Sequence, residues 1–307
     1  MSTRNDGTLN GLATEGRLPE AADLDLLPTS AQVALLCEQD HRAVRAVQAA
    51  SEQLVTAIDA AAVRLRRGGR LIEVGAGTPG RLAVLDAAEC GPTFGVEEGQ
   101  VIGVMAGGSD AVPKAAENGE DDHRAGATDL VAASLTSDDV VLAVSASGRT
   151  PYVRGAIAAA SAVRALTIAV VNNPDSPIAA ECDLAVEALT GPEVISGSTR
   201  LKAGTAQKLV LNTFSTLLMV KLGHTYGDLM VNVRASNTKL RWRSQRIVAE
   251  AAGVDTEQAA EALTEAGGQA KVATVMLLAG VDAATARSRL TAAAGHVRAA
   301  VAGSAAP

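Results

Sequence analysis

Two short runs of small residues in this chain have the composition of anion-binding loops. Residues 75–81 read GAGTPGR and follow the apolar stretch 71–74, and residues 145–150 read SASGRT and follow the apolar stretch 140–144. Each run leaves a β-type segment and opens a helix, where free backbone N–H groups and the helix dipole favour an anion. Because glycine permits close approach and Ser and Thr hydroxyls donate to phosphate oxygens, the runs predict two sides of one sugar-phosphate site.

Within and beside these runs, several residues are candidates for substrate binding. From the hydroxyls and the glycine backbone we select Gly77, Thr78, Ser145, Ser147, Gly148 and Thr150. A third helix start, residues 197–205, is dense in hydroxyls and cations. There, either Lys202 or Lys208 completes a phosphate or carboxylate site. Alternatively, both lysines cap the helix or lie on its surface without binding a ligand. Tyr152, next to the second run, packs either on a sugar or in the core.

Two glutamates are candidates for acid–base chemistry. Glu89 lies on the helix expected to start near Pro79, roughly three turns from its phosphate-binding end. It faces the site only if the helix ends at the cleft or if a neighbouring subunit brings it to another cleft. Glu120 lies in the acidic run 116–123, and such runs are usually solvated. The pattern alone therefore selects neither residue over a solvated carboxylate.

The amino-acid composition of the chain limits the classes of ligand and macromolecule that it can bind. The chain has 307 residues, 48% of them hydrophobic and only 2% aromatic, so Ala, Val and Leu must fill the core. A net charge of −7 and a pI of about 5.2 argue against nucleic acid as the main partner. An acidic chain can still bind a phosphorylated sugar, because local N–H groups outweigh the distant field.

Cysteine and histidine spacing predicts no metal site. Cys37, Cys90 and Cys182 are odd in number, far apart and without a CxxC pair, which is typical of a reducing compartment. The 4 histidines are scattered without ligand spacing. The start of the chain lacks the apolar region of a signal peptide, and no apolar run is long enough for a transmembrane helix. We therefore expect a cytoplasmic protein without a membrane partner.

The elements that must position these residues alternate between strand and helix. After a polar arm to about residue 30 and one helix over 30–67, we expect strands at 71–74, 101–105, 140–144, 166–171 and 184–187. Segments such as 81–90 and 152–163 have helical composition between them. Apolar, β-branched strands in this order predict an α/β fold with a parallel sheet covered by helices on both faces. Ligands of such sheets bind at the carboxyl ends of the strands, where both runs lie.

The last part of the chain is helical. A long helix is expected over 200–222, apolar on most sides and therefore buried. Beyond it the composition becomes Ala-rich, with helices expected at 256–266, 269–278 and 283–293. A GVD triplet precedes the first of these helices and another precedes the third. The sequence thus predicts a small C-terminal three-helix domain.

Longer motifs carry a resemblance to a known family. The family that the chain resembles is that of the N-acetylmuramic acid 6-phosphate etherases, and the matching residues are 69–72, 75–78, 80–82, 85–90, 146–152, 191–194 and 197–208, with shorter runs at 106–108, 119–121, 173–174, 227–231 and 237–240. The resemblance implies a sugar isomerase (SIS) fold, a homodimer, no cofactor and a ubiquitin-associated-like C-terminal domain. We expect an arm and helix over 1–50, the catalytic SIS domain over 51–245 and the helical domain over 246–307.

The resemblance also implies an activity: cleavage of the D-lactyl ether of N-acetylmuramic acid 6-phosphate with water, within cell-wall recycling. The products are N-acetylglucosamine 6-phosphate and D-lactate. By the resemblance Glu89 is the acid that protonates the leaving lactate and later deprotonates water, and Glu120 is the base at C2. Each must change protonation state during turnover, which favours glutamates with raised pKa values.

The chain departs from the family at two single positions and, slightly, over the segment 14–19. Pro79 stands where the family usually has Ser, which removes one hydroxyl and one N–H from the first run. This predicts weaker sugar-phosphate binding or compensation by Thr78 and the second run. Glu73 stands where relatives carry an aromatic or apolar residue, and inside a central strand it needs a partner, for which we expect an arginine.

Two other functions fit the same fold. A sugar-phosphate-sensing regulator, like the glucokinase regulators, would bind without catalysis. Those chains are longer and carry two sugar-binding domains, whereas this chain has one pair of loops and keeps both glutamates. An aldose–ketose isomerase would exchange the C2 proton but release no lactate. The etherase is therefore the function that the sequence favours.

Overall fold

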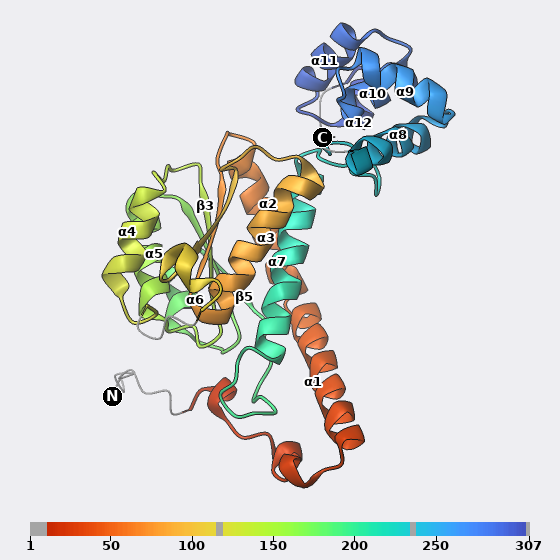
Figure 1. Cartoon of the computed structure of the whole chain (residues 1–307). Helices are drawn as coiled ribbons and strands as arrows, with labels where there is room; N and C mark the ends of the chain where they lie inside the picture. Colours follow the sequence, from red (N-terminus) through yellow and green to blue (C-terminus); the bar gives the residue numbers. More distant parts are fainter. Residues whose placement is uncertain (1–10, 115–118, 234–237, 305–307) are drawn as a thin grey trace. The chain divides into compact units, whose positions relative to one another are not determined.

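The computed structural model describes residues 11–114, 119–233 and 238–304 (Figure 1). The chain divides into two compact units, each described by itself. The first, here the sheet unit, comprises Met1–Ala87 and Val101–Phe214; the second, the helical unit, comprises Ala88–Gln100 and Ser215–Pro307. The domain boundaries expected near residues 50 and 245 stay predictions.

The sheet unit is built on five parallel strands in the order β2-β1-β3-β4-β5. Their bounds are β1 Leu71–Gly75, β2 Val101–Met105, β3 Val140–Ser145, β4 Leu166–Val171 and β5 Leu184–Glu187. All residues of β1, β3 and β4 are buried, because both faces of a parallel sheet are covered. The predicted strands and the predicted α/β class are confirmed.

One face of the sheet is covered by α4 (His123–Ala132), α5 (Pro151–Ala162) and the short α6 (Pro177–Glu181) (Figure 1). The core of this layer joins Ile72 and Val74 of β1 to Tyr152 of α5. Tyr152 is fully buried and its hydroxyl donates to Asp129 at 2.6 Å. Of the two roles open to this aromatic ring, the structure thus shows core packing.

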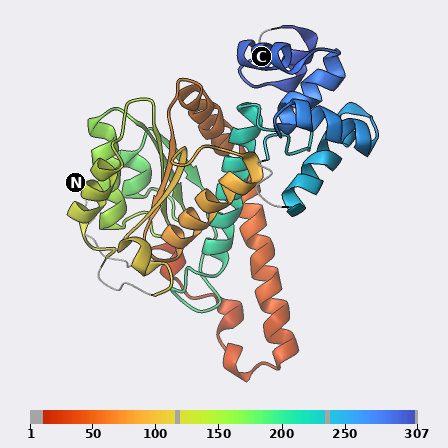
Figure 2. The same cartoon turned by 45° about the horizontal axis from the view of Figure 1, so that its top comes forward.

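The opposite face is covered by α2 (Ser51–Leu65) and by the parts of α3 (Gly77–Phe94) and α7 (Lys202–Lys221) that belong to the sheet unit (Figures 1 and 2). Helix α3 packs directly on the sheet. A Cβ placed on Gly103 of β2 would lie 2.6 Å from Cα of Val84, so only glycine permits this approach. A short 3₁₀ turn, η4 (Gly108–Ala111), follows β2.

The N-terminal region differs from the sequence-based prediction in two respects. The single helix expected over 30–67 is two helices, α1 (Thr29–Ala49) and α2, interrupted at Ala50, whose φ is −90° and ψ 9°. One non-helical residue leaves the hydrophobic period intact, so the pattern did not reveal it. The expected arm contains three 3₁₀ turns, η1 (Ala13–Glu15), η2 (Pro19–Ala21) and η3 (Leu24–Leu26).

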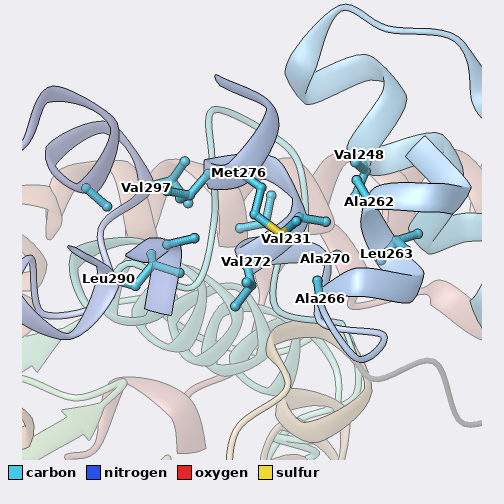
Figure 3. Packing of buried hydrophobic residues seen from close by; sticks show 14 of the residues in the cluster. Val231, Val248, Ala262, Leu263, Ala266, Ala270, Val272, Met276, Leu290 and Val297 are labelled. Carbon is cyan, nitrogen blue, oxygen red and sulfur yellow. The ribbon is translucent and has the colours of Figure 1, made fainter. Parts of the chain in front are cut away.

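The helical unit contains the three expected C-terminal helices, α9 (Thr256–Glu265), α10 (Ala270–Ala279) and α11 (Ala283–Ala292). Two further helices, α8 (Thr238–Ala252) and α12 (Val297–Ala302), complete it. Its core is aliphatic and includes Val248, Leu263, Met276, Leu290 and Val297 (Figure 3). Among the helices described, none has the length and apolar character needed to cross a membrane.

Each GVD triplet ends one helix and begins the next. Asp255 accepts backbone N–H bonds at the start of α9, and Asp282 does so at the start of α11. Gly280, with φ +62°, closes α10 in the left-handed conformation. Aspartate at a helix N-cap and glycine after a helix C-terminus are the residues that these positions favour.

Candidate functional site

The two small-residue loops follow adjacent strands. In the sheet β1 lies between β2 and β3, and Gly75 at the end of β1 is in register with Val144 near the end of β3. The strand that follows β1 in sequence, β2, therefore lies on one side of β1, and the next strand, β3, lies on its other side. Ligands of open α/β sheets bind at this switch in strand order, outside the carboxyl ends of the strands.

The first loop is short, because α3 begins at Gly77, two residues after β1 ends. A Cβ on Gly75 would lie 2.7 Å from the backbone N of Gly80, and a Cβ on Gly80 would lie 2.7 Å from the carbonyl oxygen of Gly75. Both glycines are thus required for the helix to start against the strand. The first turn of α3 carries Thr78 and also Pro79, which has no N–H to offer an anion.

The second loop is held together by its own hydroxyls. Ser145 Oγ lies 2.8 Å from Thr150 Oγ1 and accepts from the backbone N–H of Gly148 at 3.1 Å. Ser147 Oγ accepts from the backbone N–H of Arg149 at 3.2 Å. Gly148 has φ +66°, and a Cβ there would lie 2.3 Å from Cβ of Ser176. The four expected binding residues of this loop therefore form one preorganised cluster.

The start of α7 lies beside the first loop. A Cβ on Gly204 would lie 3.3 Å from Cγ2 of Thr78. The backbone N–H groups of Lys202 and Ala203 donate to the Glu193 carboxylate at 3.2 and 2.9 Å. Burial raises the pKa of Glu193, although these hydrogen bonds and the nearby Lys202 oppose the shift. The carboxyl group of Glu193 thus caps the N-terminus of α7.

Lys202, an expected ligand of substrate, is buried away from solvent in this structure. Its Nζ donates to Oε1 of Gln39 in α1 at 2.5 Å, and burial lowers its pKa. The alternative, Lys208, is exposed. The start of α7, which includes the backbone of Lys202, lies beside the first loop. The ammonium group of Lys202, however, binds Gln39 of α1.

The two glutamates occupy different settings. Glu120 is exposed, and its carbonyl oxygen accepts from the backbone N–H of Tyr152 at 3.0 Å, which fixes it beside the start of α5 and the second loop. Glu89 is also exposed and lies twelve residues after Gly77 on α3, in the part assigned to the helical unit. At the usual helical rise its Cα is about 18 Å along the axis from the start of α3.

Polar residues after β4, which sequence reasoning did not select, support the loops. Asn173 Nδ2 donates to the carbonyl oxygen of Ala146 at 2.9 Å, tying the segment after β4 to the second loop. Gln207 of α7 donates to Asn172 at 2.8 Å, and its own Oε1 is buried without a hydrogen-bond partner. The signal that could have identified the two asparagines is their position directly after an apolar strand.

The partner of Glu73 is not the expected arginine. Glu73 is fully buried in β1, and the charged group that faces it is Asp86 of α3, 7% exposed. The expectation failed because register and helix packing, which are tertiary properties, decide which group faces a buried strand residue.

Two cavities among the described residues lie away from the two loops. One, of about 750 Å³, is in the helical unit, between the segment around Gly95, the start of α10 and the C-terminal half of α11. A second, of about 520 Å³, follows β2 at the sheet edge. No group of three or more His, Cys, Asp and Glu side chains in the described ranges could hold a metal ion.

Comparison with known proteins agrees with this architecture. Residues 53–161 match the model of the glucokinase regulatory protein N-terminal SIS domain, and residues 119–217 match that of the SIS domain. The predicted SIS fold is confirmed.

Three curated relatives share about half of their residues with this chain. An N-acetylmuramic acid 6-phosphate etherase of Streptomyces coelicolor is 51% identical over 96% of this chain and 95% of its own. Proteins of the same name from Rubrobacter xylanophilus and Deinococcus radiodurans are each 53% identical, over 89% and 86% of this chain and 91% and 87% of their own. This chain belongs to the family of N-acetylmuramic acid 6-phosphate etherases.

Proposed function

We propose that this chain cleaves the D-lactyl ether of N-acetylmuramic acid 6-phosphate with water, giving N-acetylglucosamine 6-phosphate and D-lactate. The observation that carries the proposal is the 51–53% identity with curated relatives of that name over most of both chains. The reaction belongs to cell-wall recycling in the cytoplasm and uses no cofactor.

The loops at the ends of β1 and β3 bind the sugar phosphate. The hydroxyls of Ser145, Ser147 and Thr150 and the start of α5 provide donors on one side. Gly77 and Thr78, in the first turn of α3, provide them on the other side. Neutral donors and helix N-termini suffice for a phosphate, so the net negative charge of the chain does not oppose binding.

The chemistry requires one base and one acid. In the open-chain sugar the C2 hydrogen is α to the aldehyde, so Glu120 can remove it as a proton. The C3–O bond then breaks, a C2–C3 double bond forms, and Glu89 protonates the leaving lactate oxygen. Water adds to C3 by the reverse steps, with Glu89 as the base and Glu120 returning the proton to C2.

A homodimer supplies the glutamate that lies far from its own loop. Glu89 lies well along α3 from the first loop, so we place it in the site of the second subunit. The α1 region exposes an apolar surface suited to association, formed by Leu26, Val33, Leu36 and Val44. Sedimentation equilibrium tests this assembly, and a monomer at micromolar concentration would contradict it.

Release of D-lactate is the decisive assay. The purified chain, incubated with N-acetylmuramic acid 6-phosphate, should release stoichiometric D-lactate, and Glu89→Ala should release little. The similarity to a glucokinase regulatory domain makes sugar-phosphate sensing the second candidate. Binding of the substrate without lactate would support the sensor, and exchange of the C2 hydrogen without lactate would support an isomerase.

A further inference from the structure

Arg149 in the second loop carries a charge that the protein does not use. Its Nε is buried and has no hydrogen-bond partner. Among the described residues none forms an ion pair with its guanidinium. A buried, unpaired donor of a charged group is costly, so its retention indicates a ligand.

The other cations described in the neighbouring loops and helices either bind protein groups or are exposed to solvent. Arg81 of α3 donates to the carbonyl oxygens of Ala111, Val112 and Lys114, each at 2.9 Å. Among the described residues, Arg154 pairs with Glu181, Lys202 is held by Gln39, and Arg200 and Lys208 are exposed. Arg149 therefore combines a place in the loop cluster with an unsatisfied buried nitrogen.

The substrate in the proposed function has two anionic groups. Its phosphate finds neutral donors in the two loops, so it does not require Arg149. Its lactyl carboxylate requires a charged partner, and the planar guanidinium can bind a carboxylate through two parallel hydrogen bonds. The backbone N–H of Arg149 donates to Ser147 Oγ, which fixes the backbone of this residue within the loop cluster.

We infer that Arg149 is the subsite for the lactyl carboxylate and sets the preference for lactyl ethers over plain sugar phosphates. The inference rests on the proposed function, because it takes its ligand from that reaction. It adds a contact that acts on binding of the C3 substituent and leaves the phosphate contacts unchanged.

The test compares two ligands that differ by the lactyl group. Calorimetry in the Glu89→Gln background, which prevents turnover, would measure Kd for N-acetylmuramic acid 6-phosphate and for N-acetylglucosamine 6-phosphate. Adding Arg149→Gln should weaken binding of the first ligand about 10–100-fold, as expected for a lost hydrogen bond to a charged group. Binding of the second ligand should change less than about twofold, which also shows that the variant is folded.

A matched control lies five residues further along the chain. Arg154→Gln, which removes a partly exposed cation paired with Glu181, should change neither affinity. Equal weakening of both ligands by Arg149→Gln, or weakening of neither, would overturn the subsite. Lactate release by the wild-type chain tests the proposed function separately, so failure of one assay is distinguishable from failure of the other.

Discussion

Glu73 of β1 and Asp86 of α3 place two carboxyl groups opposite each other inside the sheet unit. Glu73 is completely buried, and neither of its oxygens has a well-formed hydrogen bond within the described structure. Burial, and next the charge of Asp86, raise the pKa of Glu73 well above its usual range. The folded protein thus holds a proton on Glu73 that the unfolded chain releases at a lower pH.

Replacing Glu73 should remove a pH dependence of stability. Because the pKa is raised in the folded state, the stabilisation is complete below the unfolded value near 4.5 and is lost as the pH rises toward the folded value. Glu73→Gln should therefore be more stable than wild type at pH 8, by about 1–3 kcal/mol. Urea unfolding from pH 5 to 9 measures this, and Glu89→Gln, which replaces an exposed carboxylate on α3, is the control. Parallel curves for wild type and Glu73→Gln would contradict the prediction.

Gly148 is required by both its conformation and its neighbours. Gly148→Ala should destabilise the fold by about 1–3 kcal/mol, since alanine is strained at φ +66° and its Cβ would collide with Ser176. Sugar-phosphate binding should weaken as the loop shifts. The control is Gly68→Ala, also at positive φ but with no atom within 4 Å of the added Cβ, so it incurs only the strain. Thermal unfolding of both variants separates collision from strain, and equal losses would show that no collision occurs.

Pro79 limits the donors of the first loop. Pro79→Ser restores an N–H and a hydroxyl to the first turn of α3, so affinity for N-acetylglucosamine 6-phosphate should rise about 3–10-fold. Pro79→Ala restores only the N–H and should account for part of that gain. Calorimetric affinities unchanged in both variants would show that this position does not contact the ligand.

Substitution of Glu89 or Glu120 should slow lactate release, whereas substitution of nearby carboxylates should not. Glu89→Gln and Glu120→Gln should each lower kcat about 10²–10⁴-fold, the usual contribution of a general acid or base, with little change in KM. Glu98→Gln and Asp121→Asn, both exposed and close in sequence to the two glutamates, should retain wild-type rates. Steady-state lactate assays provide the comparison. Wild-type kcat in either glutamate variant would remove that residue from the mechanism.

Mixing inactive subunits tests whether each site draws on two chains. If Glu89 acts in the partner's site, a mixed dimer of Glu89→Gln and Glu120→Gln has one intact site and one site lacking both groups. Random re-association should then restore about a quarter of wild-type lactate release. Mixtures that stay inactive, despite exchange of subunits shown by mass spectrometry, would place both glutamates in one chain.

Local patterns were sufficient for the strands and for most helices. Apolar, β-branched runs such as 140–144 marked β3, and the GVD triplets marked the helix ends in the helical unit, because these signals depend on neighbours in sequence. The composition of both anion-binding loops was likewise visible in the sequence, as was the family through its long motifs.

Tertiary structure decided which of these segments meet. That β1 lies beside β3, and so unites the two loops, depends on strand order, which no local pattern encodes. The same holds for side-chain partners: Asp86 rather than an arginine faces Glu73, and Gln39 receives the ammonium of Lys202. Such contacts join residues distant in sequence, and packing of whole layers, rather than the character of one segment, determines them.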